Sequence, residues 1–304
     1  MKKYLIYSTF LMLFFMYHIS SGITLNKTIS KKVLTHISAP LLPSTFMAEI
    51  SKLSAEVNNN KYCIYPLCVS EVNSGLIYFT EPKNGDPNLR EYFFSKYDSS
   101  LKSWEKPINI EKEYPAFLEA NKTMNFREMF ITIDNDIYRV DFKDKTFSPQ
   151  RLNINTNYIE TSPMLSPDGG TLYFVSDRPG GFGGKDIWAS ERLSDNKWSE
   201  PYNLGNEINT ASDEESPFLM LDDATLYFSS KGHKGYGGYD IFVSTRNDDG
   251  KWSVPENLGT TVNSASDDFY YVTDSYGKKA FYSSGKFHTG VQDIFSVKYN
   301  LDNE

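Results

Sequence analysis

Short apolar runs separated by turn residues fill most of this chain, and in its middle third the pattern is written twice. The stretch that begins LYFVSDRPGGFGGKDIWASERL at Leu172 returns as LYFSSKGHKGYGGYDIFVSTRN at Leu226, 54 residues later. Aligned without gaps over 42 positions from Leu172, the two copies share 23 identities. A duplication this regular predicts one structural unit that is repeated along the chain.

Each copy contains four short apolar runs, which we label A to D in chain order. In the first copy they are residues 162–165, 172–176, 186–190 and a fourth run that holds Trp198 and Leu204. A Ser-Pro-Asp-Gly turn, a glycine-rich loop and a Ser-Asp-Asn turn separate them. Runs rich in aromatic and branched residues between such turns are typical of β-strands. Each copy therefore predicts one antiparallel sheet of four strands.

The same pattern recurs in weaker form on both sides of the duplicated stretch. Residues 76–110 and 128–152 each repeat it, and a last copy has the runs 280–284 and 293–297 but no run D. Because one sheet cannot bury both of its faces, sheets of this kind pack radially and close into a ring. We predict an all-β fold over residues 61–304, a β-propeller of four-stranded blades with five recognisable repeats; a sixth blade stays open.

The last blade needs a donor for its missing fourth strand, and the N-terminal segment 23–60 can supply it. Residues 31–38 are predicted to form a strand that closes the ring by pairing with the last blade. Helical spacing of apolar residues predicts a short amphipathic helix over residues 44–57. These apolar residues are Phe46, Ile50, Leu53 and Val57.

The first 22 residues have the pattern of a secretory signal peptide. Lys2 and Lys3 precede an apolar run, and Ser20 and Gly22 are small residues at the spacing of a cleavage site. An uncleaved membrane anchor is the alternative, although the run is short for a bilayer span. No cysteine lies near the cleavage site for a lipoprotein anchor. We expect a periplasmic or secreted protein, monomeric and without a stable membrane span after cleavage.

Composition and charge narrow the function. The chain has 304 residues, a formal charge of −8 and 15% aromatic residues. An acidic chain argues against nucleic acid, which requires a basic surface. The two cysteines, Cys63 and Cys68, lie five residues apart. An oxidising compartment permits a disulfide between them, and two buried thiols are the alternative.

One family resemblance follows from these motifs. The stretch SPDGGTLYFVSDRPGGFGGKDIW, with W-x-x-P-x-N-L-G and I-N-T after it, resembles the TolB-like, WD40-like propeller repeat of bacterial cell-envelope proteins. The resemblance covers residues 161–298 strongly and 62–152 weakly. It implies a propeller, usually of six blades, and a protein-interaction role. Such repeats often stand beside peptidoglycan-binding OmpA-like domains; none is found in this sequence, so wall anchoring is not implied.

Strand direction predicts where the loops of the ring lie. In a four-stranded meander the B–C and D–A connections share one face, which we call the loop face. The longest loops of this face carry acidic residues, and Arg178 lies in a B–C loop. The candidate binding residues are Asp213, Glu214, Glu215, Asp267, Asp268 and Arg178. A solvated acidic rim is the alternative, and bound calcium, which clustered carboxylates suit, stays open.

Other residues of the repeat are interpreted as scaffold. Asp186 and Asp240 are expected to cap the glycine-rich loops through backbone hydrogen bonds. Trp198 and Trp252 recur with the repeat and are expected to lie in the core of the blades rather than to stack on sugars. The glycine-rich loops lead from strand to strand, which argues against phosphate binding.

No catalytic motif stands out. The chain contains neither G-x-S-x-G nor H-E-x-x-H, and no cofactor or metal is predicted. The stretch SPDGGTLYF resembles the Asp-box of sialidase propellers, where the box is structural. We therefore expect an exported, non-enzymatic binding or scaffold module whose partner is an envelope or secreted protein. The alternatives are a sialidase-like glycoside hydrolase and a glycan-binding module.

Overall fold

A computed structural model describes residues 48–58, 62–70, 75–82, 89–121, 127–275, 277–286 and 291–299. The predicted signal peptide and the predicted strand 31–38 lie outside these residues. The strands of the first two blades are β2 (Tyr62–Ser70), β3 (Gly75–Pro82), β4 (Glu91–Asp98), β5 (Ser103–Trp104), β6 (Ile108–Asn109), β7 (Glu128–Ile133), β8 (Asp136–Asp141) and β9 (Gln150–Arg151). One helix, α3 (Tyr114–Asn121), lies between these two blades in the sequence.

The remaining three blades contain the duplicated stretch and the C-terminal copy. Blade 3 has β10 (Glu160–Leu165), β11 (Thr171–Ser176), β12 (Asp186–Ser194), β13 (Lys197–Trp198) and β14 (Tyr202–Asn203). Blade 4 has β15 (Glu214–Leu219), β16 (Thr225–Ser230), β17 (Asp240–Thr245) and β18 (Glu256–Asn257). Blade 5 has β19 (Asp268–Thr273), β20 (Lys279–Ser284) and β21 (Asp293–Tyr299), with β1 (Ala48–Lys52) as its outer strand.

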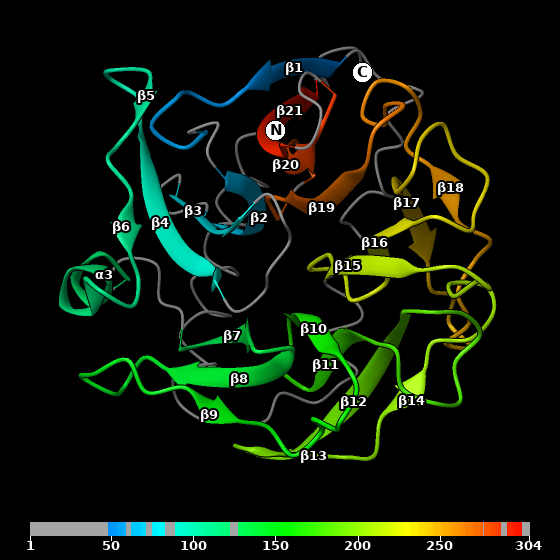
Figure 1. Cartoon of the computed structure of the whole chain (residues 1–304). Helices are drawn as coiled ribbons and strands as arrows, with labels where there is room; N and C mark the ends of the chain where they lie inside the picture. The colour runs from blue at the N-terminus through cyan, green and yellow to red at the C-terminus, as the bar shows by residue number, and fades with distance from the viewer. Residues whose placement is uncertain are drawn as a thin grey trace, which may run out of the picture. The chain divides into compact units, whose positions relative to one another are not determined.

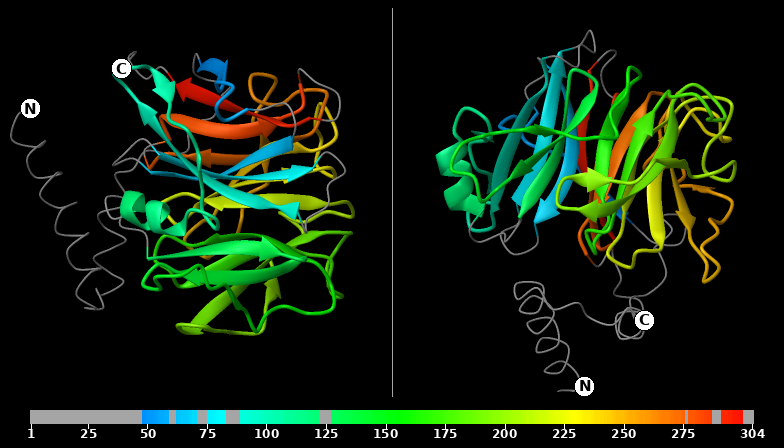
Figure 2. Two further views of the ribbon diagram at one scale, coloured as in Figure 1. Left: turned by 60° about the vertical axis from the view of Figure 1, so that its left-hand side comes forward. Right: turned by 90° about the horizontal axis from the view of Figure 1, so that it is seen from below.

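The five sheets stand around a common centre, with β2, β19, β15 and β10 innermost (Figure 1). All strand pairs within them are antiparallel, and the strands run between the two faces of the ring (Figure 2). Five blades, rather than six, agree with the five repeats read from the sequence. Blade 2 has three strands among the described residues, β7, β8 and β9.

Within the described residues, the core consists of five apolar clusters, one between each pair of neighbouring blades. Between blades 2 and 3, Phe130 lies edge-on to Trp198, whose side chain is 1% exposed. Between blades 1 and 5, Trp104 packs on Phe281 in the same geometry. Each such buried side chain contributes about 2–3 kcal/mol of transfer free energy. Stability therefore comes from contacts between blades more than from any single blade.

A short motif after strand D bonds the outgoing connection to the third strand of its own blade in blades 3, 4 and 5. In blade 3, the backbone N–H of Leu204 donates to Ile187. Asn209 then takes the place of a strand residue, because it accepts from the backbone N–H of Ile187 at 2.8 Å and donates to its carbonyl at 2.9 Å. Asn263 binds Ile241 in the same way in blade 4. We call this L-x-x-x-[IV]-N motif the asparagine staple.

The N-terminal segment closes the ring, and here one prediction is wrong. Residues 48–52, which helical spacing assigned to an amphipathic helix, form strand β1 and pair with β21 from Ala48↔Tyr299 to Lys52↔Phe295. Leu53 and Asn58 then supply the asparagine staple of blade 5, with Asn58 bonded to both backbone groups of Ile294. Pairing with the edge of β21 is favoured over the helix that the local spacing predicts, because this pairing satisfies the backbone N–H and carbonyl groups of that edge.

Two further observations complete the fold. Cys63 and Cys68 lie in the same strand, β2, opposite Glu81 and Ile77, and no disulfide joins them. Within the described residues, no helix has the length and apolar character that a bilayer span requires.

Candidate functional site: the loop face

The glycine-rich B–C loops are held rigidly by one aspartate each. Asp186 accepts hydrogen bonds from the backbone N–H groups of Phe182, at 2.6 Å, and Gly183, at 3.3 Å. Asp240 makes the matching bonds with Tyr236 and Gly237, which stand 54 residues later. Both carboxylates are buried, so the loops have one conformation set by the blade beneath them.

Each B–C loop also packs against the D–A connection that follows the same blade. The Gly184 N–H donates to the Ser212 carbonyl at 3.1 Å, and the Lys185 N–H donates to Asp213 at 3.1 Å. A side chain on Gly183 would collide with backbone atoms of the connection, which explains the glycine. Asp267 receives the Tyr239 N–H in blade 4 in the same way. The two kinds of loop therefore form a continuous rigid ridge on one face.

Two of the sequence-predicted binding residues are buried beneath this ridge. Glu214 is fully buried and accepts from the Thr210 N–H and hydroxyl and from the Ser230 hydroxyl. Asp268 is also fully buried and accepts from Ser264. Burial raises the pKa of Glu214 and raises that of Asp268 to about 6. Both carboxylates hold the start of an inner strand.

Asp213 and Asp267 are half-buried in the ridge itself. Burial opposes ionisation of Asp213, but the Lys185 N–H and the charge of Lys231 lower its pKa overall. Arg178 is turned inward, where it donates to Glu160 and to the Ile154 carbonyl and lies over the Trp188 ring. These side chains are therefore engaged within the chain rather than gathered around one opening.

Glu215 belongs to a second group, at the inner strands. It forms an ion pair with Lys185 at 2.6 Å and accepts from the Ser162 hydroxyl, which also bonds to the Tyr270 hydroxyl at 2.8 Å. A second ion pair, Glu81 with Arg90, lies within electrostatic range of it. Residues more than 100 positions apart in sequence meet here, which no local pattern indicates.

The backbone at these inner strands is strained. Ser162, Ser216 and Tyr270 stand 54 residues apart and have φ values of 50°, 56° and 53°. Each sits at a shift of register in its strand, a β-bulge that re-aims the neighbouring side chains. Left-handed conformations cost non-glycine residues about 1 kcal/mol or more. Their recurrence in three blades shows that the repeat itself encodes the bulge.

The exposed residues that sequence reasoning missed are the aromatic tips of the B–C loops. Phe182 is 51% exposed and Tyr236 is 55% exposed, and they occupy the same position of the repeat. Tyr158, on the D–A connection before β10, is 48% exposed on the same face. An aromatic residue between glycines in both copies was the available signal. By its pattern alone, this residue is predicted only as part of a glycine-rich turn.

The predicted scaffold tryptophans differ in burial. Trp198 is fully buried, whereas Trp252 is partly buried, with the Arg246 guanidinium 5.3 Å from its ring centre.

No group of three or more metal-ligating side chains occurs among the described residues.

The blades and the stapled loops define the class: a five-bladed β-propeller with a rigid loop face. The sequence matches no family model and no curated protein. Among solved structures it is similar to a putative TolB from Agrobacterium tumefaciens, with 12% identity over 84% of this chain and 99% of that chain and a TM-score of 0.44. Identity this low concerns the fold alone.

Two other similar structures are enzymes. An endo-arabinase from Bacteroides thetaiotaomicron has 15% identity over 88% of this chain and 98% of that chain, with a TM-score of 0.46. A gluconolactonase from Xanthomonas campestris has 10% identity over 86% and 93%, with a TM-score of 0.42. The prediction that this chain is not an enzyme is therefore corrected, because similar structures include enzymes and the fold does not exclude catalysis.

Proposed function

We propose that this protein is an exported propeller that binds an envelope or secreted protein through its loop face. The observation that carries the proposal is the pair Phe182 and Tyr236, two exposed aromatic side chains on rigid, aspartate-capped loops. Aromatic side chains on a pre-organised surface are typical anchors of protein interfaces, because little entropy is lost when they are covered.

The charge of the face complements this reading. Asp267 stands in the ridge on which the aromatic tips lie, whereas Asp213 is paired there with Lys231, and the chain as a whole is acidic. A partner with apolar pockets and a basic rim fits such a surface. Export to the periplasm or the medium, as a monomer, is part of the same proposal and is supported by the N-terminal sequence pattern.

Affinity capture from envelope extract of the producing cells tests the proposal. The bait is the native protein or the Phe182→Ala/Tyr236→Ala variant. A matched control, Leu193→Ala/Val254→Ala, removes two exposed apolar side chains outside the B–C and D–A loops, one near the end of β12 and one just before β18. We expect a partner, identified by mass spectrometry, that is retained by the native protein and the control and depleted at least tenfold by the loop-face variant. Equal capture by all three proteins would remove the loop face from the interaction.

A glycoside hydrolase is the second candidate, and the inner ion pairs favour it. Burial and the negative charge of Glu215 raise the pKa of Glu81, against the opposing charge of Arg90. A carboxyl group with a raised pKa near an ionised carboxylate is the usual acid–base arrangement of glycosidases. Aryl arabinosides and sialosides are suitable fluorogenic probes. We expect release of the fluorophore to be lost in Glu81→Gln; no turnover above buffer by the native protein would eliminate this candidate.

A further inference from the structure

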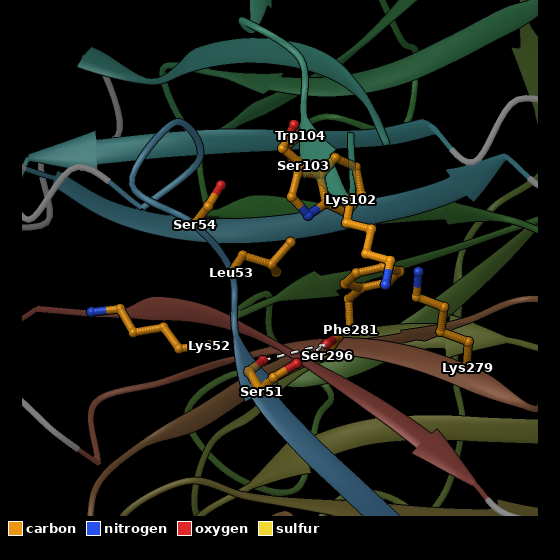
Figure 3. A pocket seen from close by; sticks show the side chains of 10 residues that line it. All are labelled: Ser51, Lys52, Leu53, Ser54, Lys102, Ser103, Trp104, Lys279, Phe281 and Ser296. Carbon is orange, nitrogen blue, oxygen red and sulfur yellow. Dashed lines mark hydrogen bonds between the residues drawn. The ribbon is translucent and has the colours of Figure 1, made fainter. Parts of the chain in front are cut away.

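A pocket of about 260 Å³ lies at the seam of the ring, where blades 5 and 1 meet (Figure 3). Trp104 and Phe281 form its apolar wall, and Lys102, Lys279, Ser51 and Ser103 are among its polar lining. No acidic residue lines it among the described residues. A basic pocket is unexpected on a chain with a formal charge of −8.

The equivalent junction between blades 2 and 3 shows how the repeat usually fills this place. There Arg192 lies 4.5 Å from the ring centre of Trp198 and forms an ion pair at 2.8 Å with Glu128, the first residue of β7. Arg246 over Trp252 has a carboxylate too, Asp223 at 3.2 Å. In both junctions, the cation that covers the tryptophan is neutralised by the protein itself.

At the seam the two charged positions are changed. Strand register places Lys279 at the position that Glu128 has in blade 2. Lys279 pairs with the residue five positions after Asp293, which begins β21, and Glu128 pairs with the residue five positions after Asp136, which begins β8. Tyr97 stands opposite Trp104, as Arg192 stands opposite Trp198. A lysine and a tyrosine therefore replace the glutamate and the arginine. At the regular junction Glu128 is paired with both Arg192 and Arg139, and Arg139 also pairs with Asp141, whereas the seam has the Lys279 charge at the position of Glu128.

The Lys279 ammonium is left without a counter-ion in the pocket. It lies 4.9 Å from the Phe281 ring centre and 6.0 Å from that of Trp104. Burial lowers its pKa, and Asp274 acts on it electrostatically without forming an ion pair among the described residues. Lys52, in contrast, is bonded to Asp293 at 2.6 Å. A partly desolvated cation is costly unless an anion compensates it.

We propose that the seam pocket binds a small, hydroxyl-rich anion, a monosaccharide-sized ligand that carries a carboxylate or phosphate group. The anionic group lies beside the Lys279 ammonium and supplies the negative charge that Glu128 supplies at the regular junction, with Lys102 as the second cation. The serine hydroxyls at the rim bind the hydroxyl groups of the ligand. The volume is sufficient for one sugar ring.

Isothermal titration calorimetry of the full chain at low ionic strength tests this site. The probes are D-glucuronate, glucose 6-phosphate, inorganic phosphate and neutral D-glucose. We expect binding of one or both acidic sugars, with D-glucose at least tenfold weaker. Lys279→Met keeps the apolar stem over the rings and should weaken binding about tenfold or more, which corresponds to about 1.4 kcal/mol. Lys102→Ala should weaken it about threefold, as expected for an exposed charge.

Lys251→Met, an exposed lysine in blade 4, is the matched control and should bind like the native protein. Inorganic phosphate that binds as tightly as glucose 6-phosphate would assign the site to the oxyanion alone and support the anion pocket without the sugar. The proposal is overturned if D-glucose binds as well as the acidic sugars, if Lys279→Met binds like the control, or if no probe binds at millimolar concentration. Thermal unfolding of each variant verifies that it folds.

Discussion

Blade 5, which lies at the seam, and blade 4 have the same strand arrangement, but their strands are connected differently along the chain. Blade 4 is made from one continuous segment, whereas blade 5 takes its outer strand and its asparagine staple from residues 48–58. Asn58 and Asn263 nevertheless bind the third strand of their blades through the same pair of backbone groups. The ring is therefore closed by the same kind of staple that blades 3 and 4 contain, made here between the two ends of the propeller.

The difference between these regions lies in their charges. The regular junctions neutralise the cation that covers each tryptophan, with Glu128 for Arg192 and Asp223 for Arg246. The seam places Lys279 there without a carboxylate in the pocket. The hydrogen bonds of the asparagine staple are the same at the seam and in blade 4, whereas the charges at the junctions differ. The hydrogen bonds therefore serve folding, and the changed charge at the seam is available to bind a ligand.

The largest expected effect comes from breaking the staple at the seam. Asn58→Ala leaves the backbone N–H and carbonyl of Ile294 buried without their side-chain partner. Each unsatisfied group costs about 1–3 kcal/mol, so we expect a loss of about 3 kcal/mol in the free energy of unfolding. Asn209→Ala in blade 3 is the matched variant and should lose the same amount. Urea denaturation measures both; a much smaller loss for Asn58→Ala would show that the seam opens independently.

A smaller, pH-dependent effect is expected from Asp268. Its pKa is about 6 in the folded protein and about 3.9 in the unfolded chain, so the folded state binds this proton more tightly. The stability from that proton is present below about pH 4 and is lost as the pH rises through about 6. Relative to Asp268→Asn, the native protein should lose about 2–3 kcal/mol over this range. Parallel stability curves for the two proteins would contradict the assignment.

The smallest effect compares the two cations over tryptophan. Arg192→Met removes one of the two arginine partners of Glu128, leaving Arg139, and also removes the hydrogen bond to the Gly169 carbonyl, which should cost about 1–2 kcal/mol. Lys279→Met removes a charge that has no ion-pair partner among the described residues, so its cost should stay below about 0.5 kcal/mol. Thermal unfolding without added ligand distinguishes them, and equal losses would mean that Lys279 is compensated within the protein.

Much of the fold could be predicted from the repeat, and the error at residues 44–57 shows the limit. The sequence LSAEVN from Leu53 to Asn58 follows the same L-x-x-x-[IV]-N pattern as LGNEIN from Leu204. Its apolar spacing also fits a helix, and local spacing alone favours neither reading. The choice depends on the free edge of β21, which lies more than 200 residues away in the sequence.

The sequence by itself determined the five repeats, most of the strands within them and the side of the ring on which the B–C and D–A loops are expected, and it left a sixth blade open. These properties depend on local apolar patterns and turn residues, and the 54-residue repeat makes both easy to recognise in the sequence. Only the tertiary structure decided that Glu214 and Asp268 are buried, that Phe182 and Tyr236 are exposed, and that Lys279 meets Trp104 across the seam. Burial and charge compensation depend on which blades become neighbours, and closure of the ring sets that order.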